Sequence, residues 1–469
     1  MPLQKLLFKP GIIKEGTAYS NEGGWFNSNL VRFRKGLPEK IGGWTKATLN
    51  YFKSSGRALH AWVDLAGTRY LGLGTTWKYY VIDGDVFYDV TPIRATTTNG
   101  IVFAATDGST TITATDSSHG AVTGDFVTLA GAVSLGGAIT AAVLNQEYQV
   151  VSAPTVNTFT FTATATANSS DSGNGGSAAD AVYQINVGLD VYVPSTGWGA
   201  DYWGAGTFGS VSALGSTNQL RVWSHANFGE DLVINARGAG IFYWDESAGL
   251  DERAVALSAL TGANLTPTVA LQVMVSDIDR HVVCFGADPL NAGETARTGA
   301  IDPMFIAWSD QENIAEWEPL PTNTAGSFRL SAGSAIIGAI RARQETLIWT
   351  DTSLYSMIFV GQPFTFSINL VNEGVGLVGP NAVINAPSGV FWMDKKGFYS
   401  YSGQIQQLPC SVAAYVFSDI NQTQSYQIFA FLNKAFDEIG WFYCSSGATV
   451  IDKYVTYNYV EELWMIGEL

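Results

Sequence analysis

The sequence is poor in the residue types on which most catalytic and metal sites depend. It has three cysteines and four histidines in 469 residues. Cys284, Cys410 and Cys444 are far apart and odd in number, so they form neither a zinc-binding spacing nor a disulfide framework. Histidines spaced for a metal, a Gly-x-Ser-x-Gly elbow and a phosphate-binding glycine loop are all missing. We therefore expect no catalytic residues, no cofactor and no metal, and a protein that is not an enzyme.

Basic residues are also scarce. There are 25 Lys and Arg against 41 Asp and Glu, a net charge of −16, which argues against a protein that wraps nucleic acid. An acidic surface would still suit a conduit through which DNA must slide without sticking. The few basic residues gather at Arg32, Arg34 and Lys35. They form either a solvated strand and turn or a docking segment for an acidic partner.

Long apolar runs and sustained helical stripes are absent from the sequence. No stretch approaches a membrane span, so we expect no stable membrane association. The N-terminus lacks the apolar core and cleavage site of a signal peptide, and the cysteine usage favours a reducing place of synthesis.

Glycines and aromatic residues are abundant, and they recur in one unit. There are 50 glycines, and 13% of the residues are aromatic. The unit is a short apolar strand, a Gly or Asp turn and a second strand rich in aromatics; it occurs at residues 79–89, 232–245, 347–359, 390–401 and 454–465. Recurring hairpins of constant chemistry are typical of radially stacked antiparallel sheets. We predict a mainly β protein whose body is a β-propeller, in which N- and C-terminal strands close one blade.

The composition changes between residues 95 and 181, where Thr, Ala, Ser and Gly dominate and tryptophan is absent. Alternating apolar and small polar residues at 110–115, 125–129, 148–151 and 159–163 predict half-buried strands. We predict a small inserted β-barrel or β-sandwich, followed by a flexible linker at 167–177. The domains are then 1–94 (arm and first propeller strands), 95–181 (insertion) and 182–469 (remaining blades, closing with the N-terminal strands).

One acidic and polar set could hold a cation. It comprises Asp277 and Asp279 together with residues 308–313, and hard ions take several oxygens from adjoining loops. The same residues at strand ends usually accept backbone N–H bonds in turns, and we favour that interpretation. A short helical turn is expected at residues 311–317 and another at 411–418.

The chain resembles the tail nozzle proteins of short-tailed bacteriophages, also called tail tubular or packaged-DNA stabilisation proteins. The residues that carry the resemblance are 24–44, with an Arg-x-Gly-x-Pro turn from Arg34 to Pro38, and the hairpin at 70–92, which ends in Asp-Val-Thr-Pro. Residues 221–235 and 308–313 are also similar to such proteins. The resemblance covers nearly the whole chain outside the insertion, and its motifs encode blade geometry.

The resemblance implies a virion tail protein, made in the bacterial host cytoplasm, that forms a hexameric ring. That ring would continue the DNA channel below adaptor and portal-proximal rings, retain packaged DNA and open for ejection. Tail fibres or spikes would dock on its outer surface, and double-stranded DNA would contact its lumen transiently. Glycine-rich loops are the candidate gate, with Trp198, Tyr202 and Trp203 in one and Gly376 and Leu377 in the other.

Other functions remain open from the sequence. Exposed aromatic rings on propeller loops would suit sugar stacking, so the main alternative is a tail-associated glycan-binding adhesin or depolymerase. Another portal-complex component and a non-viral propeller binding module are further rivals. The copy number, the neighbours and the role of the insertion are left undecided.

Overall fold

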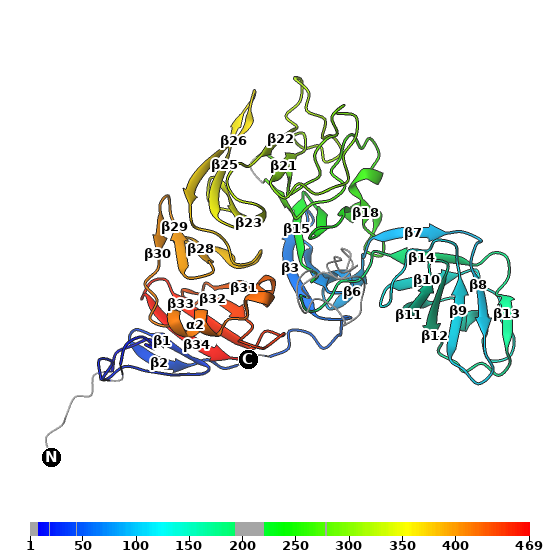
Figure 1. Cartoon of the computed structure of the whole chain (residues 1–469), viewed down its shortest axis with the longest axis horizontal. Helices are drawn as coiled ribbons and strands as arrows, with labels where there is room; N and C mark the ends of the chain where they lie inside the picture. Colours follow the sequence, from blue (N-terminus) through cyan, green and yellow to red (C-terminus); the bar gives the residue numbers. More distant parts are fainter. Residues whose placement is uncertain (1–7, 18, 44, 193–219, 277–278) are drawn as a thin grey trace, which may run out of the picture.

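A computed structural model describes residues 8–17, 19–43, 45–192, 220–276 and 279–469. The described chain is almost entirely β, and its body consists of six four-stranded antiparallel sheets arranged around an axis (Figure 1). This arrangement confirms the predicted β-propeller. The first strands of neighbouring blades contact each other in the pairs β3–β15, β15–β19, β23–β27 and β27–β31, so the first strand of each blade is the innermost.

Each blade uses four consecutive strands. Blade 1 has β3 (Gly56–Val63), β4 (Arg69–Thr75), β5 (Tyr79–Asp83) and β6 (Val86–Asp89). Blade 2 has β15 (Trp223–Phe228), β16 (Asp231–Ala236), β17 (Ile241–Trp244) and β18 (Val255–Ala256). Blade 3 has β19 (Gln272–Val275), β20 (Val282–Phe285), β21 (Phe305–Trp308) and β22 (Gly326–Arg329).

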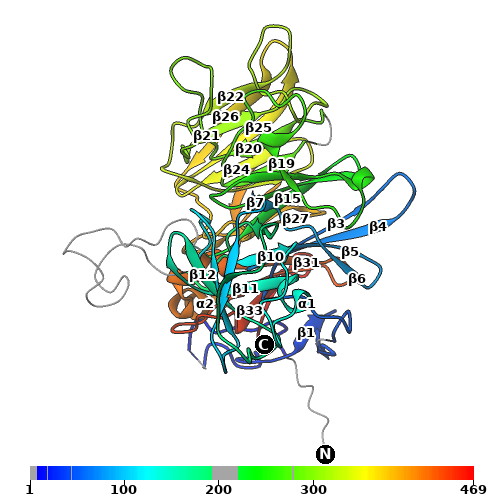
Figure 2. The same ribbon diagram turned by 90° about the vertical axis from the view of Figure 1, so that its right-hand side faces the viewer.

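The last three blades follow the same order. Blade 4 has β23 (Ile336–Arg341), β24 (Thr346–Thr350), β25 (Ser353–Gly361) and β26 (Thr365–Glu373). Blade 5 has β27 (Val383–Ala386), β28 (Gly389–Met393), β29 (Phe398–Tyr401) and β30 (Ile405–Gln407). Blade 6 has β31 (Phe429–Asn433), β32 (Glu438–Tyr443), β33 (Lys453–Asn458) and β34 (Leu463–Glu468). Figure 2 shows that the β25–β26 hairpin extends well beyond the neighbouring sheets.

The described helices are short connectors. They are α1 (Ala141–Leu144), α2 (Ala413–Asp419) and the 3-10 turns η2 (Glu246–Ala248), η3 (Leu257–Ala259) and η4 (Gln422–Gln427). Helix α2 lies where a helical turn was predicted at 411–418. Residues 311–317 instead form successive turns closed by an Asp310–Asn313 bridge, so the helix predicted there is wrong.

Aromatic side chains from the recurring hairpins fill the spaces between blades. Trp349, Trp392 and Trp441, each on the second strand of its blade, have no exposed surface and join blades 4, 5 and 6 in one core. Separate cores join blades 1 and 2 around Trp223 and Trp244, blades 2 and 3 around Val233 and Trp317, and blades 3 and 4 around Phe285 and Ile348. Burial of these large side chains is the main stabilising term of the body.

The propeller is not closed by strand exchange. We expected N-terminal strands to complete one blade, but blade 6 consists of β31–β34 alone. The N-terminal segment forms a separate hairpin, β1 (Val31–Arg34) and β2 (Leu37–Lys40), which packs beside β34. Ile12, which is fully buried, donates its backbone N–H to the Trp464 carbonyl at 2.8 Å. The segment therefore lies against the outer strand of the last blade.

Residues 93–184 form one eight-stranded antiparallel sheet beside blade 1 (Figure 1). Its strands are β7 (Ile93–Thr97), β8 (Val102–Ala105), β9 (Thr111–Thr115), β10 (Phe126–Ala130), β11 (Glu147–Thr155), β12 (Thr158–Thr162), β13 (Asp171–Asn174) and β14 (Asp180–Gln184). Strand β11 pairs with β10 at its start and, after register shifts, with β12 at its end. Such bulges bend a strand, and the two halves of the sheet enclose one core of their own.

Candidate functional site: two polar junctions on the propeller

The basic N-terminal segment is attached to its own last blade. Lys35 and Gly36 have φ angles of 52° and 75°, which is the geometry of a tight two-residue hairpin turn. Arg32 is 8% exposed and makes a two-pronged ion pair with Glu438, with Nε–Oε1 at 3.0 Å and Nη2–Oε2 at 3.2 Å. Its guanidinium carbon lies 3.4 Å from the centre of the Phe436 ring. Such paired, stacked arginines are among the stronger polar contacts in proteins.

The structure separates the three predicted docking residues. Arg32 is paired with Glu438 of the same chain. Burial raises the pKa of Glu438 and the Arg32 guanidinium lowers it, and the effect of burial is the larger, so the pKa is raised overall. Lys35 donates its backbone N–H to Glu461 Oε1 at 2.7 Å. The residues Arg34 and Lys35 themselves are exposed. Arg34 and Lys35 are therefore still predicted to contact an acidic partner, whereas Arg32 is not accessible for such a contact.

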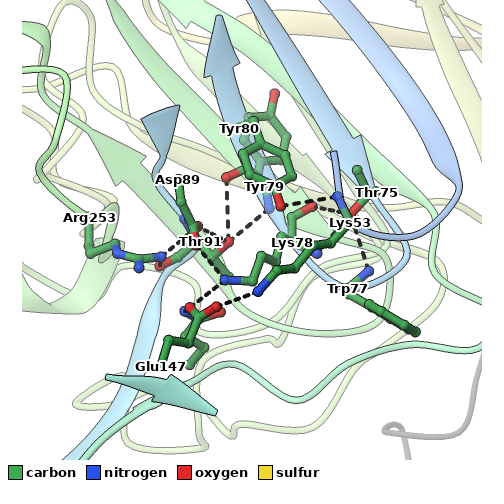
Figure 3. A network of polar contacts seen from close by, with 11 residues as sticks. Lys53, Thr75, Trp77, Lys78, Tyr79, Tyr80, Asp89, Thr91, Glu147 and Arg253 are labelled. Carbon is green, nitrogen blue, oxygen red and sulfur yellow. Dashed lines mark hydrogen bonds and ion pairs between the residues drawn. The ribbon is translucent and has the colours of Figure 1, made fainter. Parts of the chain in front are cut away.

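A buried ionic network holds the insertion to the propeller (Figure 3). Lys78, 2% exposed between β4 and β5, places its Nζ 2.6 Å from Asp89 Oδ2 and within contact of Glu147 Oε2. Glu147 begins β11 of the insertion and also binds Lys53 Nζ at 2.7 Å through Oε1. Asp89 ends β6 and pairs in addition with Arg253 of blade 2. One lysine thus connects blade 1, the insertion and, through Asp89, blade 2.

The neighbouring cations keep both carboxylates of this network ionised although they are largely buried. Burial acts to raise the pKa of Asp89, but Lys78 and then Arg253 outweigh it, so the pKa of this carboxyl is lowered. Burial likewise opposes ionisation of Glu147, and Lys78 and Lys53 lower its pKa overall. Both carboxylates are therefore charged near neutral pH, with Lys78 between them.

A second set of hydrogen bonds fixes the other side of the insertion. Asp125, fully buried at the start of β10, accepts hydrogen bonds from the Val187 and Val122 backbone N–H groups at 2.9 Å each. It also accepts one from Asn186 Nδ2 at 2.6 Å. Burial raises its pKa. Because Asn186 and Val187 leave the insertion, both the entry and the exit of this domain are fastened.

Side chains of the same chain bridge the propeller axis. Arg237, which follows β16, donates to the carbonyl of Leu271 at 3.2 Å and to that of Ile336 at 3.0 Å, and its guanidinium lies 5.3 Å from the Tyr426 ring centre. These partners stand at the starts of blades 3 and 4 and just before blade 6. The cavity beside Arg237 measures about 210 Å³, smaller than the roughly 300 Å³ from which ligand pockets begin. Within the part of the chain that the structure describes, Arg237 thus links blades 2, 3 and 4 and the segment before blade 6 across the centre of the propeller.

The predicted gate residues fall into two groups. Trp198, Tyr202 and Trp203 lie outside the described residues. Leu377 is 1% exposed in the core of blades 4 to 6, and a Cβ on Gly376 would stand 2.4 Å from the Asp351 carbonyl oxygen. Gly376 is thus needed for close packing, and Leu377 is a core residue in this structure.

The acidic and polar residues that could have held a cation, Asp279 and residues 308–313, form hydrogen bonds within the protein instead. Asp279, 2% exposed, contacts His281 Nδ1 at 3.0 Å, and His281 Nε2 lies 2.9 Å from Thr324 Oγ1. Thr324 Oγ1 in turn donates to Asp310 at 2.7 Å. Asp277 lies outside the described residues, and within the described ranges no three His, Cys, Asp or Glu side chains group as metal ligands. The order Asp279–His281–Thr324 is that of an acid, a base and a hydroxyl in a catalytic triad. The Thr324 hydroxyl, however, already donates its hydrogen to Asp310.

The sequence analysis missed the residues that organise these junctions. Lys78, Glu147 and Arg237 are charges with no charged neighbour in the sequence, and this isolation was the available signal; Arg253, which follows Asp251 and Glu252, gave no such signal. No described helix has the length and apolar character that a membrane crossing requires.

Comparisons with known proteins give only distant likenesses. No protein-family model and no curated protein sequence matches the chain. Among solved structures, it is similar to the phage phi92 endosialidase at 11% identity and a TM-score of 0.21, over 87% of this chain and 55% of that one. It is also similar to the extracellular domain of a hybrid two-component system from B. thetaiotaomicron (10%, TM-score 0.32, 86% of this chain and 38% of that one) and to apo AztD from Citrobacter koseri (9%, 0.28, 88% and 94%). The chain thus spans about half or less of the first two proteins, and likenesses as weak as these carry no argument.

Proposed function

We propose that the chain is a structural component of a short-tailed phage tail, where copies of it form a ring-shaped nozzle that continues the DNA channel. The observation that carries the proposal is the attachment of the N-terminal hairpin, β1 and β2, to blade 6. Residues 24–44, on which the resemblance to nozzle proteins depends, include the hairpin that Arg32 and Glu438 fasten to blade 6. The resemblance therefore lies in a part of the chain that has an architectural role.

The contacts of Arg237 favour a channel outside the single propeller. Because Arg237 bridges the axis of the propeller, DNA would pass through the centre of a ring of six copies, along the propeller surfaces that face this centre. A net charge of −16 per chain would keep the DNA backbone from adhering, since screened repulsion acts over about 8 to 10 Å. In this proposal the ring retains packaged DNA and opens for ejection.

The attachment of the insertion supports a role in holding other tail proteins. A domain fastened through Lys78 and Asp125 has a defined orientation, which a tethered domain would lack. We propose that adaptor or portal-proximal proteins bind one face of the ring, and that tail fibres or spikes bind its outside through the insertion. The role is mechanical and needs no catalysis.

A glycan-binding adhesin or depolymerase is the second candidate function. The observation that favours it is the exposure of single aromatic rings: Tyr19, Tyr51 and Phe364 are 92%, 85% and 76% exposed. Rings of this kind can stack on sugars.

One comparison separates the two functions. The purified chain is imaged by negative-stain microscopy, alone and mixed with the adaptor protein of the same phage, and is assayed for glycan binding and for glycan hydrolysis. Rings of six copies, or their formation on adaptor, without glycan binding would support the nozzle. Monomers in both samples, together with glycan binding or cleavage, would refute the nozzle and support the second candidate.

A further inference from the structure

The junction between the first and last blades differs from the other five. Apolar cores join blades 1–2, 2–3, 3–4, 4–5 and 5–6, and no core among the described buried residues joins blade 6 to blade 1. The innermost strands of these two blades leave apolar side chains uncovered: Leu59 of β3 is 61% exposed and Phe429 of β31 is 40% exposed. We call this junction the seam.

A cavity of about 390 Å³ occupies the seam. Blade 1 contributes Leu59, Leu73 and Phe87 to its wall, and blade 6 contributes Phe429 and Ile451. Protein interiors are normally packed without voids larger than a water molecule. An apolar gap of this size means that the two blades do not gain the contact energy that holds the other junctions together.

The contacts that cross the seam are few and polar. Arg57 Nη1 of blade 1 donates to Gln427 Oε1, just before blade 6, at 3.3 Å. Tyr192 and Gln424 exchange two hydrogen bonds of 2.9 Å between the segment after the insertion and η4. Hydrogen bonds at partly exposed positions contribute little net stability each, so the contacts of the described residues hold this junction less firmly than the apolar cores hold the other five.

The covalent chain keeps the ends together even if the seam parts. It passes from the β1–β2 hairpin, which is attached to blade 6, directly to β3 of blade 1. No strand is shared across the seam, so parting it breaks no sheet ladder.

We propose that the propeller opens and closes at the seam between blades 1 and 6, with the five core-packed junctions acting as one C-shaped body. The movement changes the distance between the outer edges of these two blades while each blade stays folded. This device does not depend on the proposed function, because it follows from the packing of a single chain.

Distance measurements between spin labels test the proposal. In a Cys410→Ser background, Val86→Cys on blade 1 and Val450→Cys on blade 6 place labels at exposed positions beside the cavity wall. Two control pairs each share one of these labels and cross a core-packed junction: Val86→Cys with Val255→Cys, and Val450→Cys with Lys395→Cys. We expect a distance distribution for the seam pair that is at least about twice as wide as for either control, because domain-scale motions exceed those of packed elements.

A cavity-filling substitution completes the test. A Cβ on Gly56 would lie 3.5 Å from Leu73 and 3.7 Å from Phe52, which is ordinary contact distance, and Gly56 lines the cavity. Gly56→Leu should therefore narrow the seam distribution toward the control width and leave the controls unchanged. A seam distribution as narrow as both controls would overturn the proposal. So would a wide distribution that Gly56→Leu does not narrow, because the width would then not depend on the apolar gap in the seam.

Discussion

Replacing Lys78 by methionine tests whether the buried network holds the insertion in place. The substitution keeps the unbranched apolar stem and removes the charge that lies between Asp89 and Glu147. Breaking a buried ion pair by removing one partner typically costs about 3 to 5 kcal/mol. Asp89 keeps Arg253 and Glu147 keeps Lys53, so we expect a value near the lower end, about 3 kcal/mol.

Native-state hydrogen exchange measures this loss of stability separately for each strand. A cost of about 3 kcal/mol corresponds to roughly 100-fold faster exchange from the locally open state, because each 1.4 kcal/mol is a factor of ten. We expect the increase in β5, β6 and β11, which carry or flank the network, with no change in the cores of blades 4 to 6.

Lys53→Met is the matched control, since Lys53 binds the same glutamate. Its side chain is 51% exposed, and exposed ion pairs contribute about 0 to 1 kcal/mol. We expect less than about fivefold faster exchange for this variant. Equal, small effects of Lys78→Met and Lys53→Met would refute the reasoning, because burial of Lys78 would then carry no energetic weight.

A double-mutant cycle and a pH series follow from the same geometry. Lys78→Met combined with Glu147→Gln should cost less than the sum of the two single changes, because Glu147 is the charge that Lys78→Met leaves underpaired. The pKa values of Asp89 and Glu147 are lowered in the folded protein, so their contribution to stability is present above the unfolded-state pKa of about 4 and is lost as the pH falls through the folded-state values. The difference between wild type and Lys78→Met should therefore shrink below about pH 4.

Three further predictions concern other parts of the chain. Arg32→Met should release the N-terminal hairpin, because it leaves Glu438 buried without its partner, at a cost of about 3 kcal/mol. The release should be seen as rapid trypsin cleavage in residues 9–40. The control Arg34→Ala, at an exposed position, should change the free energy of unfolding by no more than about 0.5 kcal/mol. Burial and then the neighbouring His60 lower the pKa of His225 to about 3, so its NMR signals should show no protonation between pH 8 and pH 5; titration near pH 6.5 would contradict the partly buried position of this ring beside Tyr79 and His60. Trp392→Ala should cost about 3 to 5 kcal/mol in urea unfolding because it empties the centre of the core of blades 4 to 6, and a loss below 1 kcal/mol would show that this core does not stabilise the body.

Several elements could be predicted because local patterns determine them. The hairpin at 232–245 appears as β16 and β17, and the alternating segments of the insertion appear as β9, β10, β11 and β12. In each case period-2 alternation decides which side chains can be buried, and glycine or aspartate turns decide where the strand ends. The segment at 167–177 shows the limit of composition: it was predicted as a linker, yet residues 171–174 form edge strand β13, because β8 offers a partner that the local sequence does not reveal.

The sequence by itself determined the class of fold, the repeating hairpins and the presence of a distinct module, because strand periodicity and turn chemistry act over a few residues. Only the tertiary structure decided how the ring ends meet, which cation lies between which carboxylates, and where Gly376 and Leu377 are packed. Arg32 and Glu438 are 406 positions apart and Lys78 and Glu147 are 69 apart, so no local pattern links either pair. Long-range burial, which removes charges from water only where a partner is already in place, selects such contacts after the strands have formed.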